Sequence, residues 1–419
     1  MRRSVRRSKS FSHRLPRCVR SSNAGLPAPL ICRSDSMRSM GIDRRHLLLG
    51  ALAGYAVRPV CALAAPGEGG EGGKNGTLYL NAYGDGAGGF GLAALADDGA
   101  VAWDLPLPAR AHAATIRPHT GEIVQFARRP GRFAIIVAAA TGRQLDDISN
   151  APGRRFNGHG VFSADGRILY ATENDYAGER GVIGVYAADN AYRRIGELQA
   201  HGIGPHEIVR LSERPVLAVA NGGILTHPDL PRLKLNLPSM RPALVYLDMR
   251  DGALLQEVKL PPALHQLSIR HLAVGRGDVI AVAMQYEGPE GDPVPLVAIH
   301  RPGAPDLQLL ALPEKLRRRM KQYCGSVCFD RAGRIFAVSA PRGNLVTFWD
   351  VERGVFLRAI TLADGCAIAP DIAAGMFLVA GGAGDLVRMH AVSGKTEPLL
   401  PRAGAETRHW DNHMLAAGI

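Results

Sequence analysis

The chain has 419 residues and a formal net charge of +12, with 46% apolar and 21% charged residues. This is the composition of a folded protein, so intrinsic disorder is excluded for most of the chain. A transmembrane helix is also excluded, because the longest apolar run covers only residues 47–57 and a span needs roughly 20 residues.

The positive charge is concentrated in the N-terminal segment. Residues 1–65 hold thirteen Lys and Arg residues against two acidic residues, which leaves a net charge of +1 for the other 354 residues. A nearly neutral remainder argues against nucleic acid as a partner, because contact with the phosphate backbone requires clustered cations.

Residues 1–64 are predicted to be an N-terminal extension followed by a signal peptide. Arg44 and Arg45 precede the apolar run, and Ala62-Leu63-Ala64 supplies the small residues that signal peptidase requires. This order of features resembles a twin-arginine (Tat) export signal. We therefore expect a periplasmic protein that is exported through the Tat pathway.

The start of this segment is untypical of a signal peptide, because residues 1–36 are rich in Arg and Ser and show no periodicity. Translation beginning at Met37 or Met40 would explain this, and a disordered basic leader is the alternative. Residues 58–60 before Cys61 do not form the small apolar box of a lipoprotein signal, so we expect no stable membrane anchor.

Three cysteines remain after the predicted cleavage: Cys324, Cys328 and Cys366. Cys324 and Cys328 would lie about 13 Å apart on one strand at ~3.3 Å per residue, which is too far for a disulfide. A Cys324–Cys366 disulfide stays open, and buried free thiols are favoured.

After a Gly-rich linker (65–76), residues 77–419 consist of short β-rich runs separated by turn residues. Residues 159–170 and 326–337 share one strand–turn–strand pattern, and looser copies begin near 112, 206, 271 and 366. Units starting near 77, 112, 159, 206, 271, 324 and 366 average about 51 residues, which indicates a four-stranded repeat. The prediction is an all-β, seven-bladed β-propeller, similar to WD40 and YVTN propellers in shape; a pair of β-sandwiches is the alternative.

Four histidines occupy equivalent positions in this repeat. His112, His159, His206 and His271 each open the strand expected to be innermost in its blade, and Asp411-Asn412-His413 could add another histidine. Equivalent inner positions form a ring around a propeller axis. Neutral imidazoles in a ring could bind Fe, Cu, Zn or Ni. Structural histidines and acid–base catalysis are the alternatives.

Other polar residues at strand ends are candidates for a pocket beside the ring. Turn chemistry explains Asn and Asp at such positions equally well. His227 lies in an insert (226–242) that is too long for a hairpin, and we expect it to be a surface residue. The candidates are Glu173, Asn174, Asp175, Glu207, Asn221, His227, Arg270 and His413.

The sequence contains no phosphate-binding loop, nucleophile elbow, HExxH or CxxCH motif. Enzyme chemistry therefore has no direct support from motifs, and catalytic residues are not assigned.

Six segments together resemble one protein family: residues 156–160 (FNGHG), 172–175 (TEND), 204–207 (GPHE), 220–228 (ANGGILTHP), 268–271 (SIRH) and 410–413 (WDNH). They are similar to the domain of unknown function 1513 family, which comprises exported proteobacterial propeller proteins. The resemblance implies a role in periplasmic iron handling, beside imelysin-like or haem-containing periplasmic proteins. It implies no catalytic residues.

Three hypotheses follow. The first is an exported, monomeric propeller that binds iron, another transition metal or a metal-binding partner as part of an iron-acquisition system. The second is a protein-interaction scaffold without metal, and the third is a propeller enzyme of the quinoprotein or lactonase type.

Overall fold

The computed structural model describes residues 76–230, 233–399 and 408–418. The chain divides into two compact units, 1–70 and 71–419, and all described residues belong to the second. The predicted signal peptide, including Arg44 and Arg45, lies outside the described residues, as does nearly all of the predicted linker.

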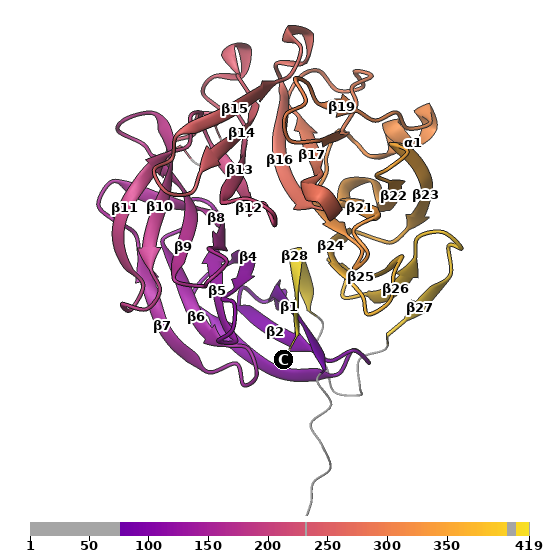
Figure 1. Cartoon of the computed structure of the whole chain (residues 1–419). Coiled ribbons are helices and arrows are strands. Elements are labelled where there is room, and N and C mark those ends of the chain that lie inside the picture. The colour runs from indigo at the N-terminus through magenta and orange to yellow at the C-terminus, as the bar shows by residue number, and fades with distance from the viewer. Residues whose placement is uncertain (1–75, 231–232, 400–407, 419) are drawn as a thin grey trace, which may run out of the picture. The chain divides into compact units, whose positions relative to one another are not determined.

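Seven four-stranded antiparallel sheets form a ring, which confirms the predicted seven-bladed propeller (Figure 1). The strands of the first three blades are β28 (His409–Gly418), β1 (Thr77–Gly84), β2 (Phe90–Leu95) and β3 (Val101–Leu107); β4 (Ala111–Ile116), β5 (Glu122–Ala127), β6 (Phe133–Ala138) and β7 (Gln144–Ser149); β8 (Arg154–Phe162), β9 (Ile168–Asp175), β10 (Arg180–Ala187) and β11 (Arg193–Gln199).

The other four blades follow in chain order. Their strands are β12 (Pro205–Arg210), β13 (Val216–Asn221), β14 (Ala243–Asp248) and β15 (Leu254–Lys259); β16 (Leu267–Val274), β17 (Ile280–Tyr286), β18 (Val297–His300) and β19 (Gln308–Leu309); β20 (Ser326–Phe329), β21 (Ile335–Ala340), β22 (Leu345–Asp350) and β23 (Val355–Thr361); β24 (Gly365–Pro370), β25 (Met376–Gly381), β26 (Leu386–His390) and β27 (Thr396–Pro398).

Short helical segments occur in the connections of the described chain. They are α1 (Glu314–Arg319) and the 3₁₀ turns η1 (Leu237–Ser239), η2 (Pro262–Leu264), η3 (Arg276–Asp278) and η4 (Pro341–Gly343). Among the described residues, no helix has the length and apolar character needed to cross a membrane.

The composition of each strand follows from how deeply it is buried in its blade. The second strand of a blade, such as β13, is buried along its whole length and is almost entirely apolar, because it packs against neighbouring blades on both faces. The outermost strand, such as β7, is polar and largely exposed. Glycines with positive φ, such as Gly166 (φ 70°) and Gly333 (φ 65°), form the tight turns that the sequence repeat predicted.

The ring is closed by the two ends of the propeller. β28 pairs with β1 as the innermost strand of the first blade, and it contacts β24 on one side and β4 on the other. The sequence repeat placed a unit start near residue 77, but β1 is the second strand of its blade. The innermost strand comes from the C-terminus, which no local pattern near residue 77 could show.

Cys324, Cys328 and Cys366 are free thiols, so the Cys324–Cys366 disulfide that the sequence left open is not formed. Burial raises the pKa of Cys324 to about 12 and raises the pKa of the other two thiols as well. These thiols are therefore protonated and poorly reactive at neutral pH.

Candidate metal centre on the propeller axis

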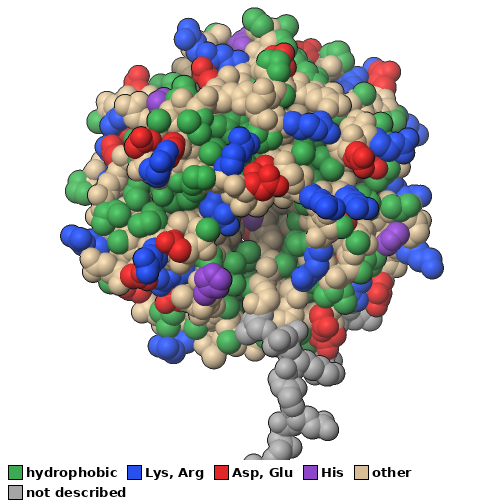
Figure 2. All heavy atoms as spheres, viewed as in Figure 1, with side chains coloured by type: hydrophobic (Ala, Val, Ile, Leu, Met, Phe, Trp, Pro, Cys, Tyr) green, Lys and Arg blue, Asp and Glu red, His purple; other side chains and the backbone are tan. Residues whose placement is uncertain are grey.

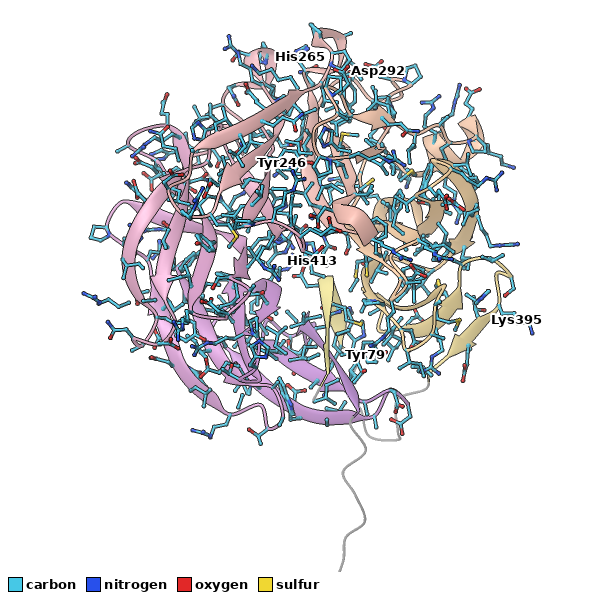
Figure 3. The ribbon with its side chains drawn as sticks, viewed as in Figure 1. Tyr79, Tyr246, His265, Asp292, Lys395 and His413 are labelled. Carbon is cyan, nitrogen blue, oxygen red and sulfur yellow. The ribbon has the colours of Figure 1, made fainter. Side chains whose placement is uncertain are left out.

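Five histidines meet at the centre of the ring, each from the innermost strand of a different blade. They are His112 on β4, His159 on β8, His206 on β12, His271 on β16 and His413 on β28. Figure 3 shows His413 at the centre of the propeller. We call this group the axial cluster; it contains all four histidines of the predicted ring and the fifth that the sequence offered as an addition.

Irregularities in the inner strands direct these side chains toward the axis. The pairing register of β4, β8 and β12 with their neighbours shifts at His112, His159 and His206 respectively. β16 shifts immediately before His271, and β28 shifts across residues 411–413. A β-bulge rotates a side chain away from the regular alternation, and bulges are common beside functional sites.

The backbone around the axial cluster is tight and strained. Gly158 has φ +98°, and a Cβ atom there would lie 2.7 Å from the His112 ring. His413 itself has φ 74°, a left-handed conformation that non-glycine residues rarely adopt. Such strain persists only where the surrounding structure holds it, and it is typical of ligand-binding sites.

The imidazole rings are close enough to share an ion. Eight ring pairs have centroids between 4.6 and 6.1 Å apart. Two triads, His112–His159–His206 and His159–His271–His413, each have their ligand nitrogens within 4.8 Å of one another. Ligands on opposite sides of an ion with ~2.1 Å bonds lie about 4.2 Å apart, so shifts of tenths of an ångström would suffice.

Several ring nitrogens in the axial cluster are buried and unpartnered. They are Nδ1 of His112 and Nε2 of His159, His271 and His413. A buried polar atom without a hydrogen bond is costly and rare, and the three Nε2 atoms belong to the histidines of one triad, which indicates a missing common partner. Imidazole nitrogens with free lone pairs are good ligands for first-row transition metals.

Glu207 orients two of the rings from behind. Its Oε2 lies 3.2 Å from Nδ1 of His271, and its Oε1 lies 3.6 Å from Nδ1 of His159. When Nδ1–H of His271 donates to this carboxylate, Nε2 keeps its lone pair and can bind a metal ion. A carboxylate behind a histidine in this way is the usual second layer of a metal site.

The histidines of the axial cluster are uncharged at neutral pH. Burial lowers the pKa of His271 to about 3 and of His413 to about 4. Burial and repulsion between the rings also hold the pKa values of the other three histidines well below the usual range. Burial raises the pKa of Glu207 to about 7. The five rings are therefore in the neutral form that binds metal.

A small cavity adjoins the axial cluster and is rich in arginine. It has a volume of about 120 Å³, and His112, His206 and His271 form part of its wall. Arg128, Arg129 and Arg270 also line it, and we call this cavity the arginine pocket. Figure 2 shows one face of the propeller, which is hollowed at its centre.

The predicted pocket residues are divided between the axis and other places. Glu207, Arg270 and His413 lie at the axis, and Asn174 lies close by, because its Oδ1 accepts a hydrogen bond (3.0 Å) from Asn157, which lines the arginine pocket. Asn221 is buried at the end of β13 and donates to the carbonyl of Ala200 (2.7 Å).

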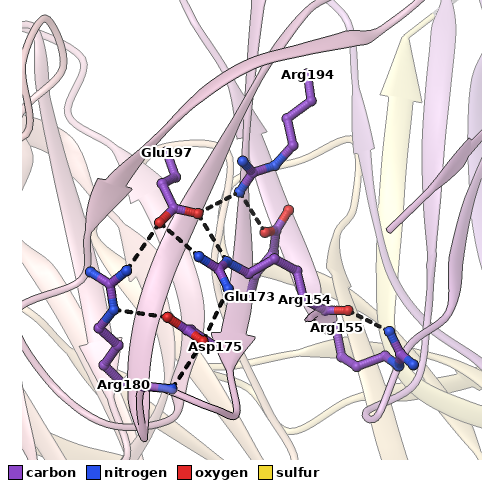
Figure 4. A network of polar contacts seen from close by, with 8 residues as sticks. Arg154, Arg155, Glu173, Asp175, Arg180, Arg194 and Glu197 are labelled. Atoms are coloured by element: carbon purple, nitrogen blue, oxygen red, sulfur yellow. Dashed lines mark hydrogen bonds and ion pairs between the residues drawn. The ribbon is translucent and has the colours of Figure 1, made fainter. Parts of the chain in front are cut away.

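Glu173 and Asp175 face away from the axis, into an ion network within the third blade (Figure 4). Arg194 donates to Glu173 (3.0 Å), and Asp175 pairs with Arg154 (3.0 Å) and Arg180 (2.9 Å). Side chains alternate along a strand, so these two residues of β9 point opposite to Asn174. Their role is structural.

His227 also lies apart from the axial cluster. It is half-exposed in the insert after β13, and its Nδ1 accepts the backbone N–H of Asp229 (3.3 Å). This placement agrees with the surface position expected from the sequence.

Sequence reasoning missed the residues that reach the axis from outside the repeat positions. Arg128 and Arg129 follow β5, and Arg128 donates to Oδ1 of Asp411 (2.9 Å). Asp411 also lies 3.9 Å from Nδ1 of His112. The adjacent arginines Arg128 and Arg129 in a nearly neutral domain were the available signal. Nothing in the sequence shows that they lie near Arg270.

Comparisons with known proteins identify a family and a fold. The family model "Protein of unknown function (DUF1513)" matches residues 105–417. No curated protein is similar in sequence. A chain of hydrazine synthase from Kuenenia stuttgartiensis is similar in structure, with a TM-score of 0.55 and 12% identity over 74% of this chain and 89% of that one. At this identity the likeness shows the fold alone.

Proposed function

Because the chain belongs to the DUF1513 family, whose function is unknown, we propose a function from the geometry of the axis itself: binding of a transition-metal ion by the axial cluster. His159 is common to both triads, and Glu207 lies beside Nδ1 of His159 (3.6 Å) and of His271 (3.2 Å), where it can accept a hydrogen bond from Nδ1–H of His271. The residues would supply neutral nitrogen ligands, and the ion would supply the positive charge that they lack.

The observation that carries this proposal is the set of four unpartnered ring nitrogens. Each buried polar atom without a partner costs about 1–3 kcal/mol. Histidines with a purely structural role would direct these atoms at a carbonyl or hydroxyl group, as His300 does toward Tyr246 (2.5 Å) and Ala304 (3.0 Å). Nε2 of His159, His271 and His413 has no such partner, and a cation shared by this triad would satisfy all three atoms.

We further propose that the metal is iron and that the protein works in the periplasm. Imidazole ligands accept Fe²⁺, Cu²⁺, Zn²⁺ or Ni²⁺, and intrinsic affinity alone favours copper over iron. The choice of iron is supported by the family resemblance, and the location by the paired arginines Arg44 and Arg45 before the apolar run. Imelysin-like or haem-containing periplasmic proteins are the proposed partners.

Metal analysis of the purified protein tests the proposal. Wild type isolated from iron-replete cells should contain about one equivalent of metal, and stripped protein should rebind Fe²⁺ under anaerobic conditions. His159→Ala removes a ligand from both triads and should abolish rebinding. His300→Gln is the matched control, because His300 is equally buried but lies outside the axial cluster.

Two results would refute metal binding. One is the absence of saturable binding of Fe²⁺, Cu²⁺, Zn²⁺ and Ni²⁺ to stripped wild type. The other is equal binding by wild type and a folded His159→Ala variant. Preference for copper or zinc over iron, measured in competition, would refute only the choice of iron.

A further inference from the structure

The arginine pocket holds more positive charge than its surroundings neutralise. Asp411 is shared between Arg110 and Arg128. Glu287 is shared between Lys234 and Arg270, and its oxygen is 3.9 Å from the Arg270 guanidinium. Arg129 has no hydrogen bond or ion pair among the described residues. Three arginines thus line the pocket, and of these Arg128 and Arg270 pair with a carboxylate while Arg129 does not.

Two guanidinium groups in this pocket, those of Arg129 and Arg270, lack a close ion-pair partner among the described residues. Arg270 is 5% exposed, and its Nε is buried without a hydrogen bond. The positive charges of Arg270 and Arg129 repel each other. Burial lowers the pKa of both groups, to about 10 for Arg270. A buried guanidinium normally has a bidentate carboxylate or phosphate partner, because its five N–H groups form a planar fork.

The lining of the pocket suits a small anion. Besides the arginines, Tyr323 and Asn412 contribute polar side chains to the wall. The volume of about 120 Å³ is far below the ~300 Å³ at which pockets for larger organic ligands begin. A nucleotide or sugar phosphate is therefore too large, while an oxyanion of four or five heavy atoms fits.

We infer that the arginine pocket is a binding site for a small oxyanion, of the phosphate or carbonate class, held by Arg129 and Arg270 directly beside the axial cluster. The anion completes the donors of both guanidinium groups and balances the local charge. The inference rests on the arginines and the cavity alone, so it holds whether or not the axial cluster binds metal.

Isothermal titration calorimetry with phosphate and with bicarbonate, in a chloride-free zwitterionic buffer at neutral pH, tests the inference. Both metal-stripped and metal-loaded protein are titrated, and the metal content of each sample is measured. At least one anion should bind at a single saturable site. Arg129→Gln should weaken that binding about tenfold or more, since it removes a charge-assisted hydrogen bond.

Arg129 is chosen because its side chain makes no hydrogen bond or ion pair with the described residues, so its replacement breaks no such interaction. Arg318→Gln is the matched control, since Arg318 is exposed and bonded only to Glu314. The inference fails if neither anion binds saturably to either form, or if a folded Arg129→Gln variant binds as tightly as wild type. If wild-type protein binds an anion but no metal, the proposed function is refuted and the anion site is retained.

Discussion

The inner strands of the seven blades fall into two groups. Those of the first five blades, β28, β4, β8, β12 and β16, each carry one histidine of the axial cluster, and each contains a shift in register. The last two, β20 and β24, carry Ser326 and Cys366 at the corresponding repeat positions. β20 pairs with β21 without any shift. All seven blades share one architecture, so the difference lies in what the inner strands present to the axis.

This contrast teaches that the fold does not require the histidines. Two blades build the same sheet with a small residue at that position, and one of them builds it with a regular inner strand. β24 also shifts register, across Cys366, so a bulge does not depend on a histidine. The left-handed backbone of His413 is an added cost, which a ligand on the axis would offset. Four predictions test the contrast, from the largest expected effect to the smallest.

The largest effect should come from adding a side chain at Gly158 of β8, where the His112 ring of β4 lies close to the backbone. Gly158→Ala places a Cβ 2.7 Å from His112 in a backbone with φ +98°. We expect a loss of about 3 kcal/mol in the free energy of unfolding, measured by urea denaturation, together with loss of metal binding. Gly153→Ala is the control: it also has positive φ (+72°) but has open space around it, so it should cost about 1 kcal/mol and retain metal.

The second prediction concerns Glu207, whose carboxylate lies beside Nδ1 of His159 and of His271. Glu207→Gln keeps the size of the side chain but weakens its hold on His159 and His271. Metal affinity should fall about 10–100-fold while the fold is retained, as is usual when such a supporting residue is replaced. Competition with a calibrated chelator would measure the change. Unaltered affinity would show that Glu207 does not orient the ligands.

The ion network of the third blade should affect stability without affecting the axis. Hydrogen bonds from Arg154, and then from Arg194, lower the pKa of Glu197 from 4.5 to about 2. A carboxylate with a depressed pKa stabilises the fold above pH 4.5, and this contribution disappears as the pH falls toward 2.

Glu197→Gln should therefore reduce the free energy of unfolding by roughly 1 kcal/mol at neutral pH, a value discounted because the group is a quarter exposed. The difference from wild type should vanish near pH 2. Thermal unfolding across the pH range checks this, with Glu257→Gln on the outer strand β15 as control. Loss of metal binding in Glu197→Gln would instead show that the ion network affects the axial cluster.

The smallest effect is expected in the group without histidines. Cys328 lies on β20 and belongs to neither triad of close ligand atoms. Cys328→Ser should therefore change metal affinity less than about twofold. A larger loss of metal affinity would show that the sixth blade contributes to the metal site. The contrast between the two groups of inner strands would then fail.

The repeat in the sequence was sufficient to predict the propeller and four histidines that lie together at its axis. A strand–turn–strand pattern is a local signal, and equivalent positions in a closed repeat must face a common centre. Glu173 and Asp175 were grouped with Asn174 because they are adjacent in sequence. The alternation along β9 separates them in space, so only Asn174 lies near the axis.

The arginine pocket and the role of Glu207 could not be predicted. Arg128 and Arg129 come from the end of a second strand, and Arg270 comes from a bulge three blades further along. The meeting of these groups depends on the rotation between blades and on the register shifts, neither of which leaves a pattern in the sequence. Glu207 was a candidate, and the predicted propeller places β12 and β16 in neighbouring blades, but the contact with His271 depends on the register shifts in both strands.

The closing strand β28 ties the chemistry of the axis to the closure of the ring. His413 reaches its place only when β28 has paired with β1. Until then the second triad lacks a ligand, so a nascent or unclosed propeller offers an incomplete site. An ion captured by that triad would tie β28 to β8 and β16, the inner strands of the third and fifth blades, and would so stabilise the closed ring.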